Sequence, residues 1–295
     1  MPCFNHGRFV AESIRAILEQ SWRELELIVV DDCSSDDSRQ VISELAAKDP
    51  RIRPIWHQRN LGASESRNDA IKVSSGSFLG FCDADDVWLP QKLAVQLTSL
   101  RSNPGFDVAY CDAQIINSQG QQTGKLFSQS FPVPQPASGF LFGELIRRNF
   151  INMQSVLMRR ECLDKAARFD EKIKWVEDWW YWVQVARFHR FIYSSEPLAN
   201  YRVHQNSTNQ VQQRGYAANR YKVFQRILRC YSDLPAKVVA ELRYKMGVEL
   251  LTLGKNQGAR RVMRQCATRA LTRWGGFRIG LKALFRVAIH RGSRT

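Results

Sequence analysis

The apolar positions of the first hundred residues alternate between a helical spacing and short continuous runs. In residues 9–20 they recur every three or four positions, which predicts a helix, and the apolar run at 25–30 predicts a buried strand. The alternation continues with helices at 36–48 and 63–74 and strands at 52–57 and 77–82. Alternating strands and helices predict an α/β fold with a mixed, mainly parallel sheet flanked by helices.

The rest of the chain is mostly helical in pattern. After Pro90 we expect a helix to about residue 100, a strand at 106–111, a loop or lid at 117–139, and helices at 140–148 and 176–189. From Tyr216 the helical pattern continues to the end, with breaks at Pro235, near Gly254 and at Gly275-Gly276. The fold is therefore predicted to carry a C-terminal helical extension.

The chain begins with residues typical of a turn, Pro2-Cys3-Phe4-Asn5. An apolar strand would be expected before such a turn at the start of a parallel sheet. We therefore expect the first strand to be truncated.

The positive charge is concentrated in the last third of the chain. Of the net charge of +15, nineteen Lys and Arg against three acidic residues fall after position 213, so residues 1–213 are close to neutral. This discontinuity predicts a domain at 1–213 and a basic helical extension at 214–295 that meets an anionic partner. The amphipathic segment 274–290 fits an anionic membrane surface, and packing on the preceding domain is the equal alternative.

Several absences in the sequence bear on location. No apolar run approaches the roughly 18 to 20 residues that span a bilayer, and the first residues lack the pattern of a signal peptide. The seven cysteines are widely spaced, form no CxxC pair and are interpreted as reduced packing residues. We expect a cytoplasmic protein, peripheral on the inner face of the plasma membrane if the tail binds lipid.

The most informative motif is an apolar strand that leads into Asp83-Ala84-Asp85-Asp86. In an extended chain alternate side chains face the same way, so Asp83 and Asp85 should face one direction and Asp86 the other. Paired carboxylates suit Mg²⁺ or Mn²⁺, and open parallel sheets bind ligands at the carboxyl ends of their strands. An acidic turn without a metal is the structural alternative.

Further motifs occur in a fixed order around this one: Pro2-Cys3-Phe4-Asn5, Val29-Val30-Asp31-Asp32-Cys33-Ser34-Ser35-Asp36, Asn60-Leu61-Gly62-Ala63-Ser64, Arg67-Asn68 and Glu177-Asp178-Trp179-Trp180. Their order and gaps closely resemble those of family 2 glycosyltransferases over about residues 1–210. The resemblance implies a GT-A (Rossmann-like) fold, a nucleotide-sugar donor, a divalent metal and inversion at the anomeric carbon.

The resemblance also implies which residues bind the donor. It assigns Asp32 to the nucleobase, which agrees with a carboxylate that accepts hydrogen bonds at the open end of a sheet. It places Phe4, with Pro2 beside it, against the face of the base. Arg67 is assigned to a uracil carbonyl or a phosphate, and Asp83 to the ribose.

Metal and base roles follow in the same way. The resemblance puts Asp85 on the metal, Mn²⁺ or Mg²⁺, and a similar tyrosine, arginine and histidine segment in relatives suggests His204 as a further ligand. Asp178 is assigned as the general base that takes the proton of the acceptor hydroxyl in a single in-line displacement. We expect a UDP-sugar as donor, a saccharide or lipid-linked acceptor, and a role in bacterial surface polysaccharide or glycolipid assembly.

Each of these residues also has a purely structural interpretation. The alternatives are an Asx turn for Asp32, core packing for Phe4, a solvated surface arginine for Arg67, helix-dipole compensation for Glu177-Asp178 and a hydrogen-bonded loop histidine for His204. These alternatives make separate predictions about burial and partners.

Two other classes of function compete with glycosyl transfer. A metal-dependent phosphotransferase or phosphatase also uses paired aspartates after a strand, but it leaves Asp32, Arg67 and Asp178 without linked roles. A nucleic-acid-binding protein is suggested by the basic tail. The near-neutral charge of residues 1–213 argues against it, so no nucleic acid is expected as a partner.

Overall fold

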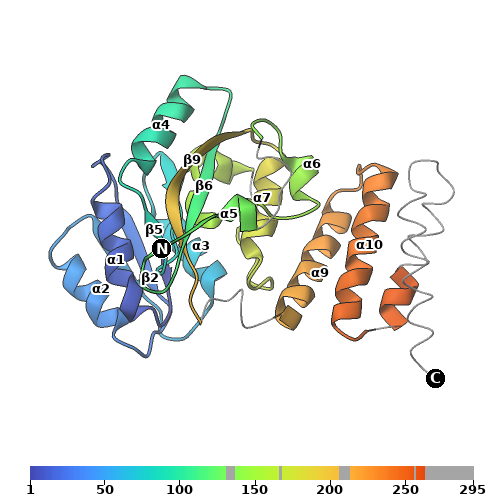
Figure 1. The fold of residues 1–295 in the computed structure, drawn as a ribbon, viewed down its shortest axis with the longest axis horizontal. Helices are drawn as coiled ribbons and strands as arrows, with labels where there is room; N and C mark the ends of the chain where they lie inside the picture. Colours follow the sequence, from blue (N-terminus) through green and yellow to red (C-terminus); the bar gives the residue numbers. More distant parts are fainter. Residues whose placement is uncertain (131–136, 166–167, 206–212, 256, 263–295) are drawn as a thin grey trace. The chain divides into compact units, whose positions relative to one another are not determined.

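The computed structural model describes residues 1–130, 137–165, 168–205, 213–255 and 257–262 (Figure 1). The chain divides into two compact units, Met1–Ser207 and Thr208–Thr295, and each is described by itself. The amphipathic segment predicted at 274–290 lies outside the described residues.

The first unit begins with a three-stranded parallel sheet of order β1-β2-β3. The strands are β1 Pro2–Cys3, β2 Leu27–Asp31 and β3 Ile52–Trp56. The helices that alternate with them are α1 Gly7–Leu18, α2 Ser38–Ala46 and α3 Ala63–Val73. Every residue of β2 is buried, as its continuous apolar run predicts for a strand covered on both faces. The predicted βαβα order is therefore confirmed.

The start of the chain differs from the expectation. Pro2–Cys3 is a strand rather than part of a turn, and it pairs with β2 through Pro2↔Val30 and Cys3↔Asp31. The backbone leaves the strand after Cys3, where Asn5 takes a left-handed conformation with φ 55°. Asparagine tolerates that region better than most residues, which explains why the bend falls there.

A second sheet of six strands has mixed pairing in the order β4-β8-β6-β9-β5, with β7 on β6. Its strands are β4 Phe78–Gly80, β5 Val87–Trp88, β6 Val108–Ile116, β7 Gln122–Leu126, β8 Leu157–Arg159 and β9 Phe191–Arg202. The pair β6–β9 is parallel and the other pairs are antiparallel. The segment 117–139, predicted as loop or lid, contains β7 and the short helix α5 Phe127–Ser130.

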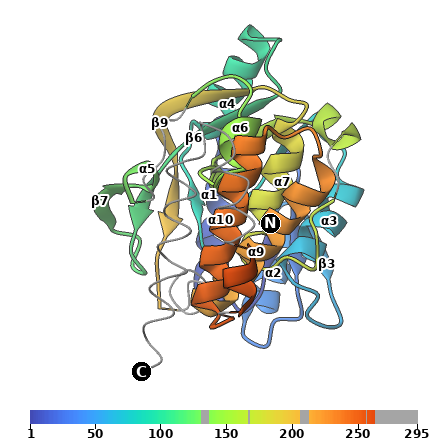
Figure 2. The ribbon, with the colours of Figure 1, turned by 90° about the vertical axis from the view of Figure 1, so that its right-hand side faces the viewer.

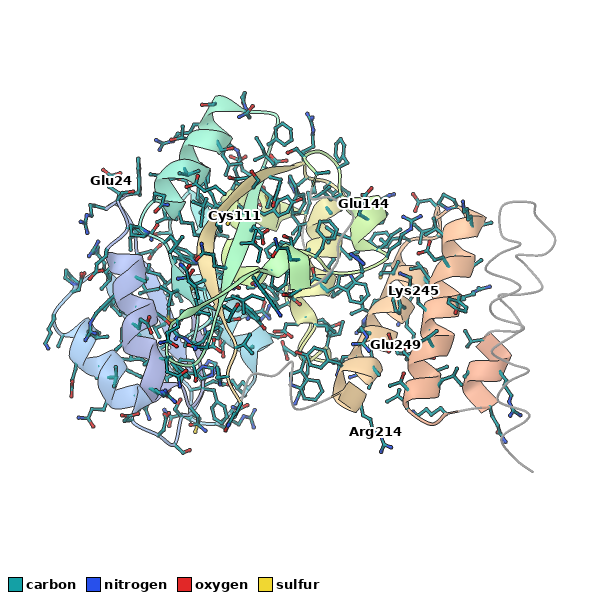
Figure 3. All side chains as sticks on the ribbon, viewed as in Figure 1. Glu24, Cys111, Glu144, Arg214, Lys245 and Glu249 are labelled. Carbon is teal, nitrogen blue, oxygen red and sulfur yellow. The ribbon has the colours of Figure 1, made fainter. Side chains whose placement is uncertain are left out.

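Helices complete this unit. They are α4 Lys92–Ser102, α6 Phe142–Leu145 and α7 Glu177–Ala186, with 3₁₀ turns η1 Met153–Ser155 and η2 Arg160–Asp164. All residues of α7 except Asp178 are buried, as expected for a helix that is apolar around its whole circumference. Helix α6 is shorter than the predicted 140–148. Cys111, on β6, is buried as expected of a packing residue (Figure 3). Cys33 and Cys230 are exposed, so the packing interpretation is wrong for these two.

The second unit contains α9 Gln213–Cys230 and α10 Ala236–Thr252, which pack side by side (Figure 2). Apolar residues of α9, including Val223 and Ile227, are fully buried, and Arg220 pairs with Glu249 at 2.8 Å. Glu249 lies on α10 (Figure 3). Pro235 precedes the first turn of α10, where a missing backbone N–H costs little. Among the residues that the structure describes, no helix is long and apolar enough to cross a membrane.

Candidate functional site

The segments that follow β1 and β2 are held together by short side chains. The Asn5 N–H donates to Ser34 Oγ at 3.0 Å, and Asn5 Oδ1 accepts from the Ser35 N–H at 2.8 Å. The backbone of Gly7 lies so close to Asp37 that a Cβ on residue 7 would collide with its carboxylate. The carboxyl ends of two parallel strands therefore form one connected edge, which is where ligands bind in open α/β sheets.

Phe4, in this edge, is exposed. Its side chain is 44% accessible, so core packing, the structural alternative for this residue, is wrong. Pro2 lies beside it in β1 and is half-buried. An aromatic face left open to solvent is available for stacking, and the contact of Phe4 with a nucleobase stays a prediction.

Asp32 is buried, and both of its carboxylate oxygens are hydrogen-bonded inside the protein. Oδ1 lies 2.7 Å from His57 Nδ1 and accepts from the Leu61 N–H at 2.8 Å, while Oδ2 accepts from the Gly62 N–H at 2.7 Å. Gly62 has φ 90°, which favours glycine, and directly precedes α3. Asp32 therefore fixes the loop that leads to Arg67, and its contact with the nucleobase stays a prediction.

Arg67 joins the two acidic motifs of the chain. It is 5% exposed, and its two Nη atoms each donate at 2.6 Å, one to Asp83 and one to Glu177. The solvated surface arginine of the structural alternative is therefore wrong. Burial disfavours the charged guanidinium, but the two carboxylates outweigh this effect, raise the pKa of Arg67 and orient its side chain. Both terminal nitrogens of Arg67 already have partners in the protein. A contact of Arg67 with the donor stays a prediction.

The acidic motif after β4 turns rather than continuing as the expected extended chain. The strand ends at Gly80, and the Asp86 N–H donates to the Asp83 carbonyl at 3.1 Å. The side chains nonetheless divide as predicted, since Asp86 is 1% exposed while the side chains of Asp83 and Asp85 are 33% and 17% exposed. Burial and the two neighbouring carboxylates raise the pKa of Asp86 well above its usual range.

Arg202 on β9 holds this turn in place. Its N–H donates to Asp86 Oδ1 at 2.8 Å, its Nε to the Asp85 carbonyl at 2.7 Å, and its Nη2 to Glu12 at 2.7 Å. The arginine is 2% exposed. The backbone that carries the Asp85 side chain is therefore hydrogen-bonded to β9.

Asp85 forms a cluster with two histidines. His204 Nε2 lies 3.0 Å from Asp85 Oδ2, and ligand atoms of His6, Asp85 and His204 all lie within 4.8 Å of one another. Burial alone would raise the pKa of Asp85, but the His204 hydrogen bond and the nearby imidazoles hold it below its usual value. Imidazole and carboxylate together suit a divalent transition-metal ion, so the residues fit the metal that the motifs imply. Sequence reasoning missed His6, although it directly follows the Pro2-Cys3-Phe4-Asn5 motif.

Asp178 lies in the first turn of α7. Its Oδ2 accepts from Asn149 Nδ2 at 2.8 Å and its Oδ1 from the Trp179 N–H at 2.7 Å. Burial and the neighbouring Glu177 raise its pKa from 3.8 to about 7. A carboxylate that only compensated a helix dipole would be stabilised in its charged form, whereas this one is poised to accept a proton near neutral pH.

A cavity of about 350 Å³ is a separate feature of this unit. It runs between β2 and β4 and is lined mainly by apolar residues, including Met1, Ile28 and Phe81, and it reaches Arg67. Its lining includes neither Asp85 nor Asp178. We therefore place the chemistry at the ends of the strands and not in this cavity.

Comparison with known proteins identifies the class. The family model for glycosyl transferase family 2 matches residues 1–156, just over half of the chain, so the protein belongs to this family and is a glycosyltransferase. The family predicted from the motifs is thereby confirmed. This result favours glycosyl transfer over the phosphotransferase and nucleic-acid-binding alternatives.

Two relatives illustrate the likeness. The Escherichia coli protein WfgD, named as a UDP-Glc:α-D-GlcNAc-diphosphoundecaprenol β-1,3-glucosyltransferase, is 26% identical over 87% of this chain and 93% of its own length. An uncharacterized glycosyltransferase of Rickettsia bellii is 30% identical over 70% of this chain, and the match spans 29% of that longer protein.

Solved structures share the fold. S. aureus TarS 1–349 in complex with UDP-GlcNAc has a TM-score of 0.66 and 18% identity, over 99% of this chain and 90% of that one. The mannosyltransferase PcManGT from Pyrobaculum calidifontis, in complex with GDP-Man and Mn²⁺, has a TM-score of 0.61 and 16% identity. The match covers 98% of this chain and 84% of that one. The predicted GT-A fold is confirmed by these similarities.

Proposed function

We propose that the protein transfers a sugar from a nucleotide-diphosphate sugar, a UDP-sugar, to a hydroxyl of a saccharide or lipid-linked acceptor, with inversion at the anomeric carbon. One observation carries the proposal. Arg67 forms ion pairs with Asp83 and with Glu177 of α7. Asp83 belongs to the same motif as Asp85, a member of the candidate metal cluster, and Glu177 precedes Asp178, whose pKa is about 7. The cluster and this carboxylate therefore belong to one connected site. The name of the relative WfgD supports a UDP-sugar as donor and a lipid-diphosphate acceptor.

On the donor side, Phe4 stacks on the base with Pro2 beside it, and Asp83 receives the ribose. Asp32 contacts the base, in addition to fixing the loop at 61–62. Arg67 contacts the diphosphate, in addition to holding the Glu177 carboxylate. Asp85 and His204 would hold Mn²⁺ or Mg²⁺, and such an ion, when bound, neutralises charge on a diphosphate leaving group.

On the acceptor side, Asp178 takes the proton of the attacking hydroxyl. Its raised pKa matches a base that works near neutral pH, because a base is most effective when its pKa lies close to the pH of the reaction. Asn149 orients one carboxylate oxygen by its 2.8 Å hydrogen bond. A single displacement with one base gives inversion and needs no covalent intermediate.

The arrangement of the chain fits a reaction at a membrane surface. We propose that residues 1–213 form the catalytic domain and that the basic residues of 214–295 attract an anionic surface that carries the lipid-linked acceptor. The reaction then takes place on the cytoplasmic face of the plasma membrane and contributes to surface polysaccharide or glycolipid assembly.

The test is transfer from a panel of UDP-sugars, in the presence of Mn²⁺, to a GlcNAc-diphosphate lipid, with UDP release and product mass as readouts. Wild type should form a glycosylated lipid, and Asp178→Asn should lose at least about 100-fold in kcat, as expected for a missing general base. Asp164→Asn, an exposed aspartate on η2, is the matched control and should behave like wild type. Equal turnover by wild type and Asp178→Asn would refute the assignment of the base.

A further inference from the structure

We propose that His6 is a third protein ligand of the divalent cation, and that it makes the site prefer Mn²⁺ and related transition metals over Mg²⁺. The inference rests on the proposed function, in which Asp85 and His204 hold the ion. It adds a ligand from a different part of the chain and a metal preference to that site.

The separations within the cluster suit a common ion. Two ligand atoms at right angles and about 2.1 Å from an ion are about 3 Å apart, and two opposite ones are about 4 Å apart. His204 Nε2 and Asp85 Oδ2 are 3.0 Å apart, and all three ligand atoms lie within 4.8 Å of one another. A small movement of the His6 side chain would bring its ligand atom into the same coordination sphere.

An unsatisfied nitrogen points to the same conclusion. His6 Nδ1 is buried and has no hydrogen-bond partner within the part of the chain that the structure describes. Buried polar atoms are nearly always paired, and one without a partner costs free energy. A cation bound through Nδ1 would supply the missing partner.

The backbone holds His6 toward the cluster before any ion binds. The His6 N–H donates to Ser38 Oγ and the Gly7 N–H to Asp36 Oδ2, both at 2.9 Å. The His6 ring meets the His204 ring edge to face, with centroids 6.1 Å apart. Folding therefore already orders the backbone of His6 beside the cluster, and metal binding has to order only its side chain.

The ligand set determines the metal preference. Two imidazoles and one carboxylate suit Mn²⁺ and the later transition metals, whereas Mg²⁺ strongly prefers oxygen ligands. The Asp83 carboxylate, which would supply a further oxygen, is engaged by Arg67 at 2.6 Å. Removal of His6 should therefore weaken Mn²⁺ binding and leave Mg²⁺ binding nearly unchanged.

The experiment uses the full chain with metal alone as the probe. Electron spin echo envelope modulation of bound Mn²⁺ reports each coordinated imidazole through its ¹⁴N nuclei, so wild type should show two and His6→Gln one. Calorimetric titration should show Mn²⁺ binding weakened at least about tenfold in His6→Gln, since even indirect partners of a metal contribute that much, and Mg²⁺ binding changed less than about twofold. His189→Gln, a histidine paired with Asp107 outside the cluster, is the matched control and should keep both signals.

The wild-type spectrum alone decides the ligand count, so the test does not depend on the folding of a variant. A single imidazole in wild type, or unchanged Mn²⁺ affinity in a folded His6→Gln protein, would overturn the inference. These readouts need no sugar donor. Absence of transfer activity with two imidazoles still bound would refute the proposed function and leave the role of His6 supported.

Discussion

Replacement of Asp178 by Asn removes the proposed base and should stabilise the protein relative to wild type. This difference in the free energy of unfolding should grow as the pH rises. The folded environment raises the pKa of Asp178 from 3.8 to about 7, through burial first and then the charge of Glu177. The folded state therefore binds this proton more tightly than the unfolded state. Wild-type stability falls as pH rises from about 4 to about 7, and the variant lacks this loss.

The size of the effect follows from the shift. About three pKa units at 1.36 kcal/mol each give an upper limit of about 4 kcal/mol above pH 7. Partial solvent access to the Asp178 side chain reduces this figure, and we expect about 2 kcal/mol. In wild type the Asn149 amide donates a hydrogen bond to Asp178. An Asn side chain at position 178 accepts this hydrogen bond less well than a carboxylate, so part of the gain in the free energy of unfolding is offset.

The assay is urea unfolding of wild type and Asp178→Asn at pH 5, 6, 7 and 8. The free energy of unfolding of the variant minus that of wild type should increase with pH and level off above pH 7. Asp164→Asn, an exposed residue, should show no such trend. A difference that stays constant across this range would mean that Asp178 titrates normally, and the argument for a base poised near neutral pH would fail.

Three further predictions concern the same site. Glu177→Gln should move the acidic limb of the pH profile of kcat/KM below pH 7, because it removes a charge that raises the pKa of Asp178; an unmoved limb contradicts this. Arg67→Met should lower the free energy of unfolding by about 3 kcal/mol in urea titrations, since a buried carboxylate loses its partner; unchanged stability contradicts the bridging role. Phe4→Ala should weaken UDP binding about tenfold by calorimetry, with Phe188→Ala as the exposed control, and equal affinities would exclude stacking.

The sequence predicted the features that depend on local pattern. Helix and strand periods gave the order of elements around β2. The expected separation of Asp86 from Asp83 and Asp85 is also found, but a turn produces it and not the extended chain on which the prediction was based. The antiparallel pairings of the second sheet were not predicted, because all except β6–β7 join segments distant along the chain and β7 lies in a segment predicted as loop.

The contacts within the site were also beyond pattern reasoning. Asp32 and Arg67 are surrounded by partners that their own motifs do not reveal: the loop at 61–62, His57 and Glu177. His6 approaches Asp85 because the fold brings the end of β1 to the turn after β4, and a lone histidine after a strand gives no signal of that approach.

Binding of UDP-glucose measured by calorimetry, with and without Mn²⁺, tests the central claim most directly. The account predicts that wild type and Asp178→Asn bind the donor alike and require Mn²⁺, and that Asp85→Ala binds at least about tenfold more weakly. Donor binding that is indifferent to Mn²⁺ and unchanged in Asp85→Ala would contradict a metal-assisted donor site at the end of the sheet.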